Sequence, residues 1–550
     1  MGKYSFRSNE EIVVLIPAAG SIKSACNYDL SFKNPAFLNI GSTLAIEEIR
    51  NKLDYKIILA VEDKENYFYK FKPFLNIQVI NVGNTESITE TIKKALNLID
   101  AKMVLINPIT SIPTDNKINS SFIEFGSLML PKENWSSLTF DNDGIPIFHS
   151  KFEQKSKGLE SYPFTGRIFA NKNDLISVIK DLKGLEKEDL ICLASELFFR
   201  EKLEIKFSNW LDIGHIATYP LTKVSTIKSR YFNFFDFDIS NNVLIKKSEN
   251  KLKIENEIEY YQTIPSELKR YFPTLINVKK TEKLISYELD YIAKPSLSEI
   301  YLFSEIGPNA IKRIINSLKR IFDNFYDKKP IVYENASWLY SKKCSSREKQ
   351  ILKIIDKEKF SILKRIYFKE FIVNKFSFPP LKETYKLLKG ELKLYEKNRP
   401  IHLGHGDLCF NNILIDPIYG EVNLIDPKAQ KHQELGINGL IDSFYDLAKL
   451  NHSIEGLYDS IVNNLFNLKE IRPNKFQFEV YKPKEYEVFN YFFKELILYN
   501  KISENQLRVI TGNLFLTMLP MHFEDPERII AFAFMGNILI HKCSTKKFIL

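Results

Sequence analysis

The first part of the chain alternates short apolar runs with longer stretches in which apolar residues recur at helical spacing. Runs without polar positions predict buried strands, and the stretches between them predict helices that cross from one strand to the next. A helix is also expected after Asn84–Ser87, where hydroxyl and acidic residues form an N-terminal capping pattern. The predicted strands are Ile12–Ile16, Lys56–Val61, Ile77–Val82 and Met103–Ile106. This pattern predicts a parallel α/β sheet, whose ligands bind at loops after the carboxyl ends of the strands.

Further along, the pattern changes to strands followed by many helices. Tyr231–Phe237 and Asn242–Lys247 are aromatic and β-branched runs joined by turn residues, which predicts a hairpin. Leu284–Ile292 predicts another strand. Apolar residues then recur at helical spacing and are expected in the core: Ile311, Ile314, Ile315, Leu318, Ile321, Phe322 and Phe325. The Lys- and Glu-rich segment Ser345–Glu396 is predicted to be a helical insertion, and Ser503–His541 is expected to complete an α+β domain.

The join between the two patterns lies at Thr218–Arg230, which contains a proline and several Ser and Thr residues. We therefore expect two domains, residues 1–228 and 229–550. A chain of 550 residues is long enough for each domain to bury its own core.

Composition narrows the class of protein. A hydrophobic content of 44% with 26% charged residues predicts a globular chain. The apolar runs are too short to cross a membrane and the N-terminus lacks an apolar signal segment, so a cytoplasmic location without membrane insertion is expected. The five cysteines are scattered, which indicates neither a disulfide framework nor a zinc site.

The net charge of +9 raises the hypothesis of a nucleic-acid partner. Basic residues are mixed with acidic ones, as in Arg347–Lys359, and this is typical of solvated helix faces rather than of a nucleic-acid-binding stripe. No nucleic-acid partner is expected.

One short segment carries a specific chemical pattern. Asp407 follows His405 and Gly406, Asn412 comes five residues later, and Asp426 follows a second apolar run. The two runs around a turn, Ile413–Ile415 and Val422–Ile425, predict a hairpin that holds Asn412 near Asp426. Transfer of a γ-phosphoryl group needs a carboxylate that orients the attacking hydroxyl, which we assign to Asp407, and oxygen ligands for Mg²⁺. Asn412 and Asp426 are the expected metal ligands.

This pattern resembles the aminoglycoside phosphotransferase and choline kinase family. The resemblance implies a bilobal protein-kinase-like fold, with a small lobe at 229–293 and a large lobe at 294–550, ATP as the phosphoryl donor, and a small alcohol as acceptor. It also implies that Lys246, at the end of a strand, pairs with the α- and β-phosphates. Asp446, in an Asp-Leu-Ala helix, is expected to hold the backbone of the catalytic loop.

The partner that orients Lys246 is expected on the helix that follows it. Glu257 is favoured over its acidic neighbours, because the apolar positions Ile254, Ile258 and Tyr261 place it beside the buried face of that helix.

The N-terminal domain has a second resemblance. Pro17–Gly20, Asn34–Gly41 and Trp210–Gly214 together resemble the sugar-phosphate and choline-phosphate nucleotidyltransferases, which implies a Rossmann-like fold. The family's Ala-Ala-Gly loop cradles nucleotide phosphates, so the resemblance assigns this role to Ala19 and Gly20.

In this family a nearby Arg neutralises the triphosphate and two Asp residues bind metal. Ser24 stands at the position of the Arg, with Lys23 beside it as a substitute, and Ala36 replaces the Lys of a Pro-Lys pair. Asn107 stands where the first metal-binding Asp is expected, and Asp212 retains the second. Loss of such charges weakens transition-state stabilisation. The domain is therefore either a working nucleotidyltransferase that uses CTP or another nucleoside triphosphate, or a degenerate domain that binds a nucleotide or sugar ligand.

The two resemblances together imply one pathway. A choline-, ethanolamine- or sugar-like alcohol would be phosphorylated, then activated as a nucleotide adduct for capsule or lipopolysaccharide synthesis. One alternative keeps only the kinase, beside a degenerate N-terminal domain. The other makes the chain a non-catalytic ligand-binding scaffold.

Overall fold

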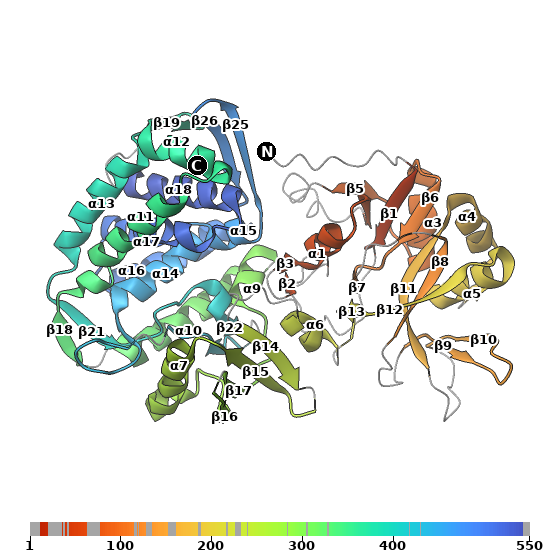
Figure 1. The fold of residues 1–550 in the computed structure, drawn as a ribbon, viewed down its shortest axis with the longest axis horizontal. Coiled ribbons are helices and arrows are strands. Elements are labelled where there is room, and N and C mark those ends of the chain that lie inside the picture. Colours follow the sequence, from red (N-terminus) through yellow and green to blue (C-terminus); the bar gives the residue numbers. More distant parts are fainter. Residues whose placement is uncertain are drawn as a thin grey trace. The chain divides into compact units, whose positions relative to one another are not determined.

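The computed structural model describes two compact units, Met1–Lys228 and Ser229–Leu550 (Figure 1). The described residues are 11–19, 36, 39–40, 43–62, 77–114, 118, 120–127, 135–151, 161–184, 189–215, 218–225, 233–238, 240–282, 284–303, 306–326, 329–416, 419–428 and 431–542.

A mixed sheet forms the centre of the first unit. Its main path runs β10-β9-β11-β6-β1-β4-β5, while β8 pairs with both β11 and β12. The strands are β1 (Ile12–Pro17), β4 (Lys56–Val61), β5 (Gln78–Asn81), β6 (Met103–Ile106), β8 (Phe122–Gly126), β9 (Ser137–Phe140), β10 (Pro146–His149), β11 (Tyr162–Asn171) and β12 (Glu204–Ser208). β6, β1, β4 and β5 are parallel, and β11 runs antiparallel to β6. The unit has the predicted α/β class.

Helices and short strands complete this unit. The helices are α1 (Ala45–Lys52), α3 (Ile88–Leu98), α4 (Lys172–Asp181), α5 (Leu190–Glu201) and α6 (Tyr219–Ser225), and the short strands are β2 (Asn39–Ile40), β3 (Thr43–Leu44), β7 (Ser111–Pro113) and β13 (Trp210–Asp212). The predicted N-cap of α3 is present, since the Glu90 N–H donates to Ser87 Oγ at 3.2 Å. All four predicted strands are also present.

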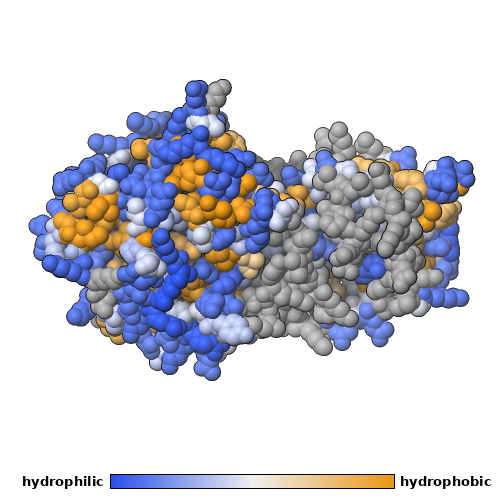
Figure 2. Space-filling view, turned by 90° about the horizontal axis from the view of Figure 1, so that it is seen from below, coloured by the Kyte–Doolittle hydropathy of each residue, from blue (hydrophilic) through white to orange (hydrophobic). Residues whose placement is uncertain are grey.

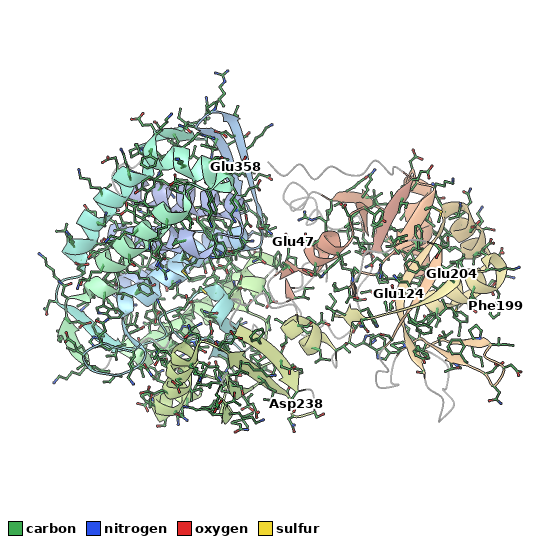
Figure 3. All side chains as sticks on the ribbon, in the orientation of Figure 1. Glu47, Glu124, Phe199, Glu204, Asp238 and Glu358 are labelled. Atoms are coloured by element: carbon green, nitrogen blue, oxygen red, sulfur yellow. The ribbon has the colours of Figure 1, made fainter. Side chains whose placement is uncertain are left out.

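The core of this sheet contains one buried ion pair. Arg167 on β11 lies 2.8 Å from Glu124 on β8, and the two side chains are 2% and 0% exposed. Figure 3 labels Glu124 on the sheet. Lys206 on β12 lies 3.6 Å from the same carboxylate. A buried charge without a partner is strongly destabilising, so these residues are expected to be needed together.

The second unit begins with an antiparallel sheet of order β14-β15-β17-β16. Its elements are β14 (Asn233–Asp238), β15 (Val243–Ser248), α7 (Lys251–Thr263), α8 (Ser266–Lys269), β16 (Leu275–Lys280) and β17 (Ile285–Asp290). The predicted hairpin is β14-β15, with Asp238 at the end of β14 (Figure 3). Tyr231 lies outside the described residues. The sequence analysis did not predict β16, because most of its side chains are exposed and do not alternate clearly.

The rest of the second unit is mainly helical. Its helices are α9 (Leu297–Phe303), α10 (Pro308–Tyr326), α11 (Ser341–Ile354), α12 (Ser361–Phe368), α13 (Leu381–Tyr395), α14 (Ser443–Ile454), α15 (Tyr458–Val462), α16 (Tyr486–Tyr499), α17 (Glu504–Met518) and α18 (Pro526–Lys542). All seven apolar positions predicted as core in α10 are buried. A sheet-containing part followed by a mainly helical part gives this unit the predicted α+β class.

The prediction of a helical insertion at Ser345–Glu396 is confirmed in part, since most of the segment lies in α11, α12 and α13. Between α12 and α13 the chain forms a hairpin of β19 (Phe371–Val373) and β20 (Phe376–Phe378), and β19 also pairs with β26 (Lys475–Val480). β26 pairs in turn with β25 (Phe466–Arg472). The hairpin turns at Asn374, whose φ of 58° lies in the left-handed region that Asn tolerates. Its short apolar run alternates with period two, and the surrounding helical pattern obscured that period.

On the face shown in Figure 2, the hydrophobic residues among those described form separate patches between hydrophilic residues. Scattered exposed apolar side chains are normal for globular proteins. No helix in the described ranges is long and apolar enough to span a bilayer.

Candidate functional site

The loop that carries Asp407 follows β21 (Arg399–Leu403) and leads through a short 3-10 helix, Phe410–Asn412, into β22 (Ile413–Ile415). Gly406 adopts a φ of +75°, a conformation that residues with a Cβ rarely adopt. A Cβ at this position would also approach the Lys428 side chain to 3.0 Å. The glycine between His405 and Asp407 is therefore required by the backbone of the loop.

Asp446, in the first turn of α14, binds the backbone of this loop. Its carboxylate accepts hydrogen bonds from the N–H groups of His405 at 3.0 Å and Gly406 at 2.9 Å. Tyr326 donates its hydroxyl to the same carboxylate. Burial raises the pKa of Asp446, while the donors that surround it oppose this shift. Asp446 thus fixes the loop that presents Asp407.

The predicted hairpin of β22 and β23 (Val422–Leu424) is present and sets the spacing of the next two residues. Ile413 pairs with Leu424, and the Ile425 N–H donates to the Asn412 carbonyl at 3.0 Å. Asn412 Nδ2 donates to the backbone carbonyl of Asp407 at 2.8 Å. Asp426 follows directly with a φ of 51° and a side chain that is 53% exposed. The hairpin therefore brings the segment before Asp426 beside the loop that carries Asp407.

Lys246 on β15 connects this region to the small sheet. Its ammonium lies 2.8 Å from Glu257 Oε2 and 2.9 Å from Asp426 Oδ1. Tyr287 also donates its hydroxyl to Glu257 at 2.9 Å. Burial alone would lower the pKa of Lys246, but the two carboxylates outweigh burial and raise it. Partial burial likewise opposes ionisation of Asp426, whose side chain remains half exposed, and Lys246 overcomes this effect and lowers the pKa of Asp426 to about 2.

Lys449 is a site residue that the sequence analysis missed. It lies on α14, three residues after Asp446, and its Nζ is 2.8 Å from Asp407 Oδ1. Burial opposes ionisation of Asp407, but the Lys449 ammonium outweighs burial and lowers the pKa of Asp407. The three-residue spacing between Asp446 and Lys449 could have revealed Lys449, because residues three apart share a helix face. A residue on the face of Asp446 can reach the loop that Asp446 holds.

Two more lysines lie near this pair. Lys343 on α11 donates to the hydroxyl of the buried Tyr445 at 2.6 Å. Lys428 Nζ lies 5.5 Å from the centroid of the same ring. We call Lys343, Lys428, Lys449 and Tyr445 the basic cluster. Burial would raise the pKa of Tyr445, but Lys343, Lys428 and Lys449 together lower it to about 7.

The oxygen groups of Asn412 and Asp426 suit a hard divalent cation such as Mg²⁺, which is commonly held by one or two protein ligands plus phosphate oxygens. Within the described ranges, no three His, Cys, Asp or Glu side chains gather into a metal-binding group. Asn412 and Asp426 would be the protein ligands of such a cation.

In the first unit, the predicted phosphate loop is only partly described. Ala19 follows β1 and packs against the core of the sheet. Gly20 and Lys23 lie outside the described residues, as do most residues of the predicted segment Asn34–Gly41.

Asn107 and Asp212 lie on connected elements. Asp212 on β13 is opposite Ser111 of β7, and Asn107 Nδ2 donates to the Ser111 carbonyl at 2.9 Å. Asp212 is buried, and its Oδ2 accepts hydrogen bonds from the His215 N–H at 3.0 Å and from the Thr218 hydroxyl. These contacts give the carboxylate of Asp212 a structural role in closing the loop after β13.

Comparisons with known proteins found similarity at the level of fold. No family model matches the chain, and no curated protein matches it. Among solved structures, an aminoglycoside-3'-phosphotransferase of type VIII is similar at 12% identity and a TM-score of 0.29, over 55% of this chain and 100% of that one. A ternary complex of aminoglycoside phosphotransferase APH(4)-Ia with AMP-PNP and hygromycin B shares 9% identity at a TM-score of 0.36, over 59% of this chain and 98% of that one. UDP-glucose pyrophosphorylase complexed with UDP-glucose shares 12% identity at a TM-score of 0.31, over 40% of this chain and 100% of that one.

Proposed function

We propose that the second unit is an ATP-dependent phosphotransferase that acts on a small alcohol. The observation that carries this proposal is the joint placement of Lys246, Glu257 and Asp426, beside a hairpin whose Asn412 is bonded to the backbone of Asp407. These residues come from two distant parts of the sequence, Lys246 with Glu257 and the segment from Asp407 to Asp426. Phosphoryl transfer needs positioned charge more than covalent chemistry, and this set supplies it.

Each residue has a role in this proposal. Asp407 accepts the hydrogen bond of the acceptor hydroxyl and takes its proton late in the reaction, because its lowered pKa makes it a weak base. The hydroxyl oxygen forms a bond to the γ-phosphorus, the bond to the bridging oxygen breaks, and ADP leaves. Lys246 binds the phosphates of ATP, and Glu257 orients it. Asn412 and Asp426 would hold Mg²⁺, which neutralises phosphate charge when bound.

Substitution of Asp407 tests this function directly. ADP release by the full chain with ATP and Mg²⁺ is measured over choline, ethanolamine, glycerol and hexoses. Asp407→Asn keeps the size of the side chain and removes its charge, so turnover should fall at least about 100-fold. Asp356→Asn, an exposed carboxylate on the same unit, is the matched control and should leave turnover unchanged. Equal turnover in wild type and Asp407→Asn would refute the assignment and favour a non-catalytic scaffold.

For the first unit we propose nucleotide binding, and activation of the phosphorylated product in synthesis of surface polysaccharide such as capsule or lipopolysaccharide. The support is the α/β sheet and the position of Ala19 at the carboxyl end of β1. Asn107, which stands in place of a carboxylate, is the observation behind the alternative, in which this unit binds a nucleotide or sugar ligand without catalysis. Calorimetric titration of the full chain with CTP, UTP and a nucleotide sugar, with the kinase site filled by AMP-PNP, should show binding. No heat from any of them would remove this proposal.

A further inference from the structure

The basic cluster gathers three ammonium groups from three separate segments around Tyr445, and one of them, Lys449, contacts Asp407. Lys343 lies on α11, Lys428 follows Asp426 by two residues, and Lys449 lies on α14. Lys343 Nζ is 4.8 Å from the centroid of the Tyr445 ring, besides its hydrogen bond to the hydroxyl. Tyr445 is 1% exposed, whereas Lys343 and Lys428 are partly exposed.

The cluster has more positive than negative charge. Lys449 is paired with Asp407, but in the described part of the chain Lys343 and Lys428 form no ion pair with a carboxylate. Two acidic residues of α14 and its N-cap, the element that carries Tyr445 and Lys449, already have other partners. Asp442 is held by Arg399 at 2.7 Å, and Asp446 by the backbone of the catalytic loop.

Like charges gathered in a partly buried place are costly unless an opposite charge joins them. Burial and the neighbouring Lys428 lower the pKa of Lys343 to about 7. This lowered pKa reflects the free-energy cost of holding the Lys343 ammonium beside another positive charge. An anion bound beside Lys343 and Lys428 would offset it with charge-assisted hydrogen bonds.

We propose that the acceptor alcohol itself carries an anionic group, a phosphate or a carboxylate, which Lys343 and Lys428 bind while Asp407 engages the hydroxyl to be phosphorylated. This inference rests on the proposed kinase function and narrows its acceptor. A quaternary ammonium or amine acceptor needs an aromatic cage or carboxylates, and here ammonium groups would repel it. The acceptor class is therefore an acidic or already phosphorylated sugar or polyol rather than choline or ethanolamine.

The same chemistry has a second source, since the γ-phosphate of ATP is also an anion. Lys428 is close in sequence to the predicted metal ligand Asp426, so it alone does not separate the two sources. Lys343 is the better probe, because it comes from a helix that carries none of the predicted nucleotide-binding residues.

The first test is a panel of matched acceptors with the full chain. ADP release is measured with glycerol against glycerol 3-phosphate and glycerate, with glucose against glucose 6-phosphate and glucuronate, and with choline and ethanolamine. The anionic member of at least one pair should show kcat/KM about tenfold or more above its neutral partner. Best turnover with a neutral or cationic acceptor would overturn the inference and leave the kinase proposal standing.

Substitutions then separate the two sources of the anion. Lys343→Met keeps the length of the side chain and removes its charge, so KM for the anionic acceptor should rise about tenfold while KM for ATP stays the same. Lys342→Met, an exposed neighbour on the same helix, is the control for net charge and should change neither. A rise in KM for ATP alone would assign the cluster to nucleotide phosphate and overturn the inference. Lys343→Gln, which removes the charge but keeps a donor for the Tyr445 hydroxyl, provides a second variant if Lys343→Met does not fold.

Binding distinguishes failure of the inference from failure of the kinase proposal. With AMP-PNP and Mg²⁺ present, glycerol 3-phosphate should bind the wild-type chain in calorimetric titration, and Lys343→Met should abolish this heat. Such binding without turnover that depends on Asp407 would count against the kinase proposal alone. If neither glycerol 3-phosphate nor glucose 6-phosphate nor glucuronate binds, the anion site is refuted.

Discussion

At the residue scale, the buried Lys246 pairs with two carboxylates, those of Glu257 and Asp426, which differ in their exposure to solvent. Its side chain is 7% exposed and Glu257 is 5% exposed, whereas Asp426 is 53% exposed. The contact with Glu257 is therefore shielded from water, and the contact with Asp426 is weakened by solvent. We infer that Glu257 fixes Lys246 and that Asp426 remains available to other cations.

Replacing Lys246 should destabilise the second unit. Lys246→Met leaves Glu257 buried without its closest cation, and we expect a loss of about 3 kcal/mol in the free energy of unfolding. The double variant Lys246→Met/Glu257→Gln should recover part of the loss, because the stranded charge is gone. Urea unfolding followed by circular dichroism measures both. A double variant no more stable than Lys246→Met would show that Glu257 is not the residue left unpaired.

The pKa of Asp426 predicts how this contribution depends on pH. The carboxyl has an ordinary pKa of 3.8, which Lys246 lowers to about 2 in the folded chain against the opposing effect of burial. A lowered pKa means that the stabilisation is present above pH 4 or so and is lost as the pH falls towards 2. The stability difference between wild type and Lys246→Met should therefore shrink between about pH 4 and pH 2. A difference that stays constant over this interval would contradict the ion pair with Asp426.

At the scale of elements, α14 serves the site twice from one face. Asp446 fixes the backbone at His405 and Gly406, and three residues later Lys449 contacts the carboxylate of Asp407. The helix begins with its own cap, since the Phe444 N–H donates to Asp442 Oδ1 at 3.1 Å. One helix thus fixes the backbone of the loop that carries Asp407 and also supplies the cation that pairs with Asp407.

Asp446→Asn should impair catalysis without removing nucleotide binding. The amide keeps the shape of the side chain but can place an NH₂ group against the loop N–H groups, which leaves buried donors unsatisfied. We expect kcat to fall at least about tenfold, with KM for ATP changed little. Steady-state kinetics on the full chain measure both values, with Asp356→Asn as control. A selective rise in KM for ATP would instead place Asp446 in nucleotide binding.

At the scale of the whole molecule, the chain divides into two compact units. The first unit is built around the mixed sheet and its buried Arg167–Glu124 pair. The second unit contains every residue of the proposed phosphotransferase site. Two compact units of this kind commonly unfold in separate steps.

Asp212→Asn tests this independence. The substitution weakens hydrogen bonds that close the loop after β13, so the unfolding step of the first unit should lose about 1–3 kcal/mol. ADP release by the second unit should stay unchanged, because Asp212 belongs to the other unit. Differential scanning calorimetry and the ADP assay measure the two effects. A parallel loss of ADP release would show that the units are coupled.

The sequence alone predicted the strands and hairpins that depend on the local pattern of apolar and polar residues. The run Ile12–Pro17 is a buried strand because it lacks polar positions, and the hairpin of β22 and β23 follows from two apolar runs around a turn. Local pattern also placed Asp407 and Asn412 five residues apart, with Asp426 after the hairpin.

Tertiary structure alone decided which distant charges meet. Nothing local pairs Lys449 with Asp407, or brings Lys343 to Tyr445 across about a hundred residues of sequence. The pairing of β19 with β26, a strand from much later in the chain, is another contact that local pattern does not predict. The periodicity of apolar residues predicts which face of a helix or strand is buried. The residues that this face contacts depend on how whole helices and strands pack together.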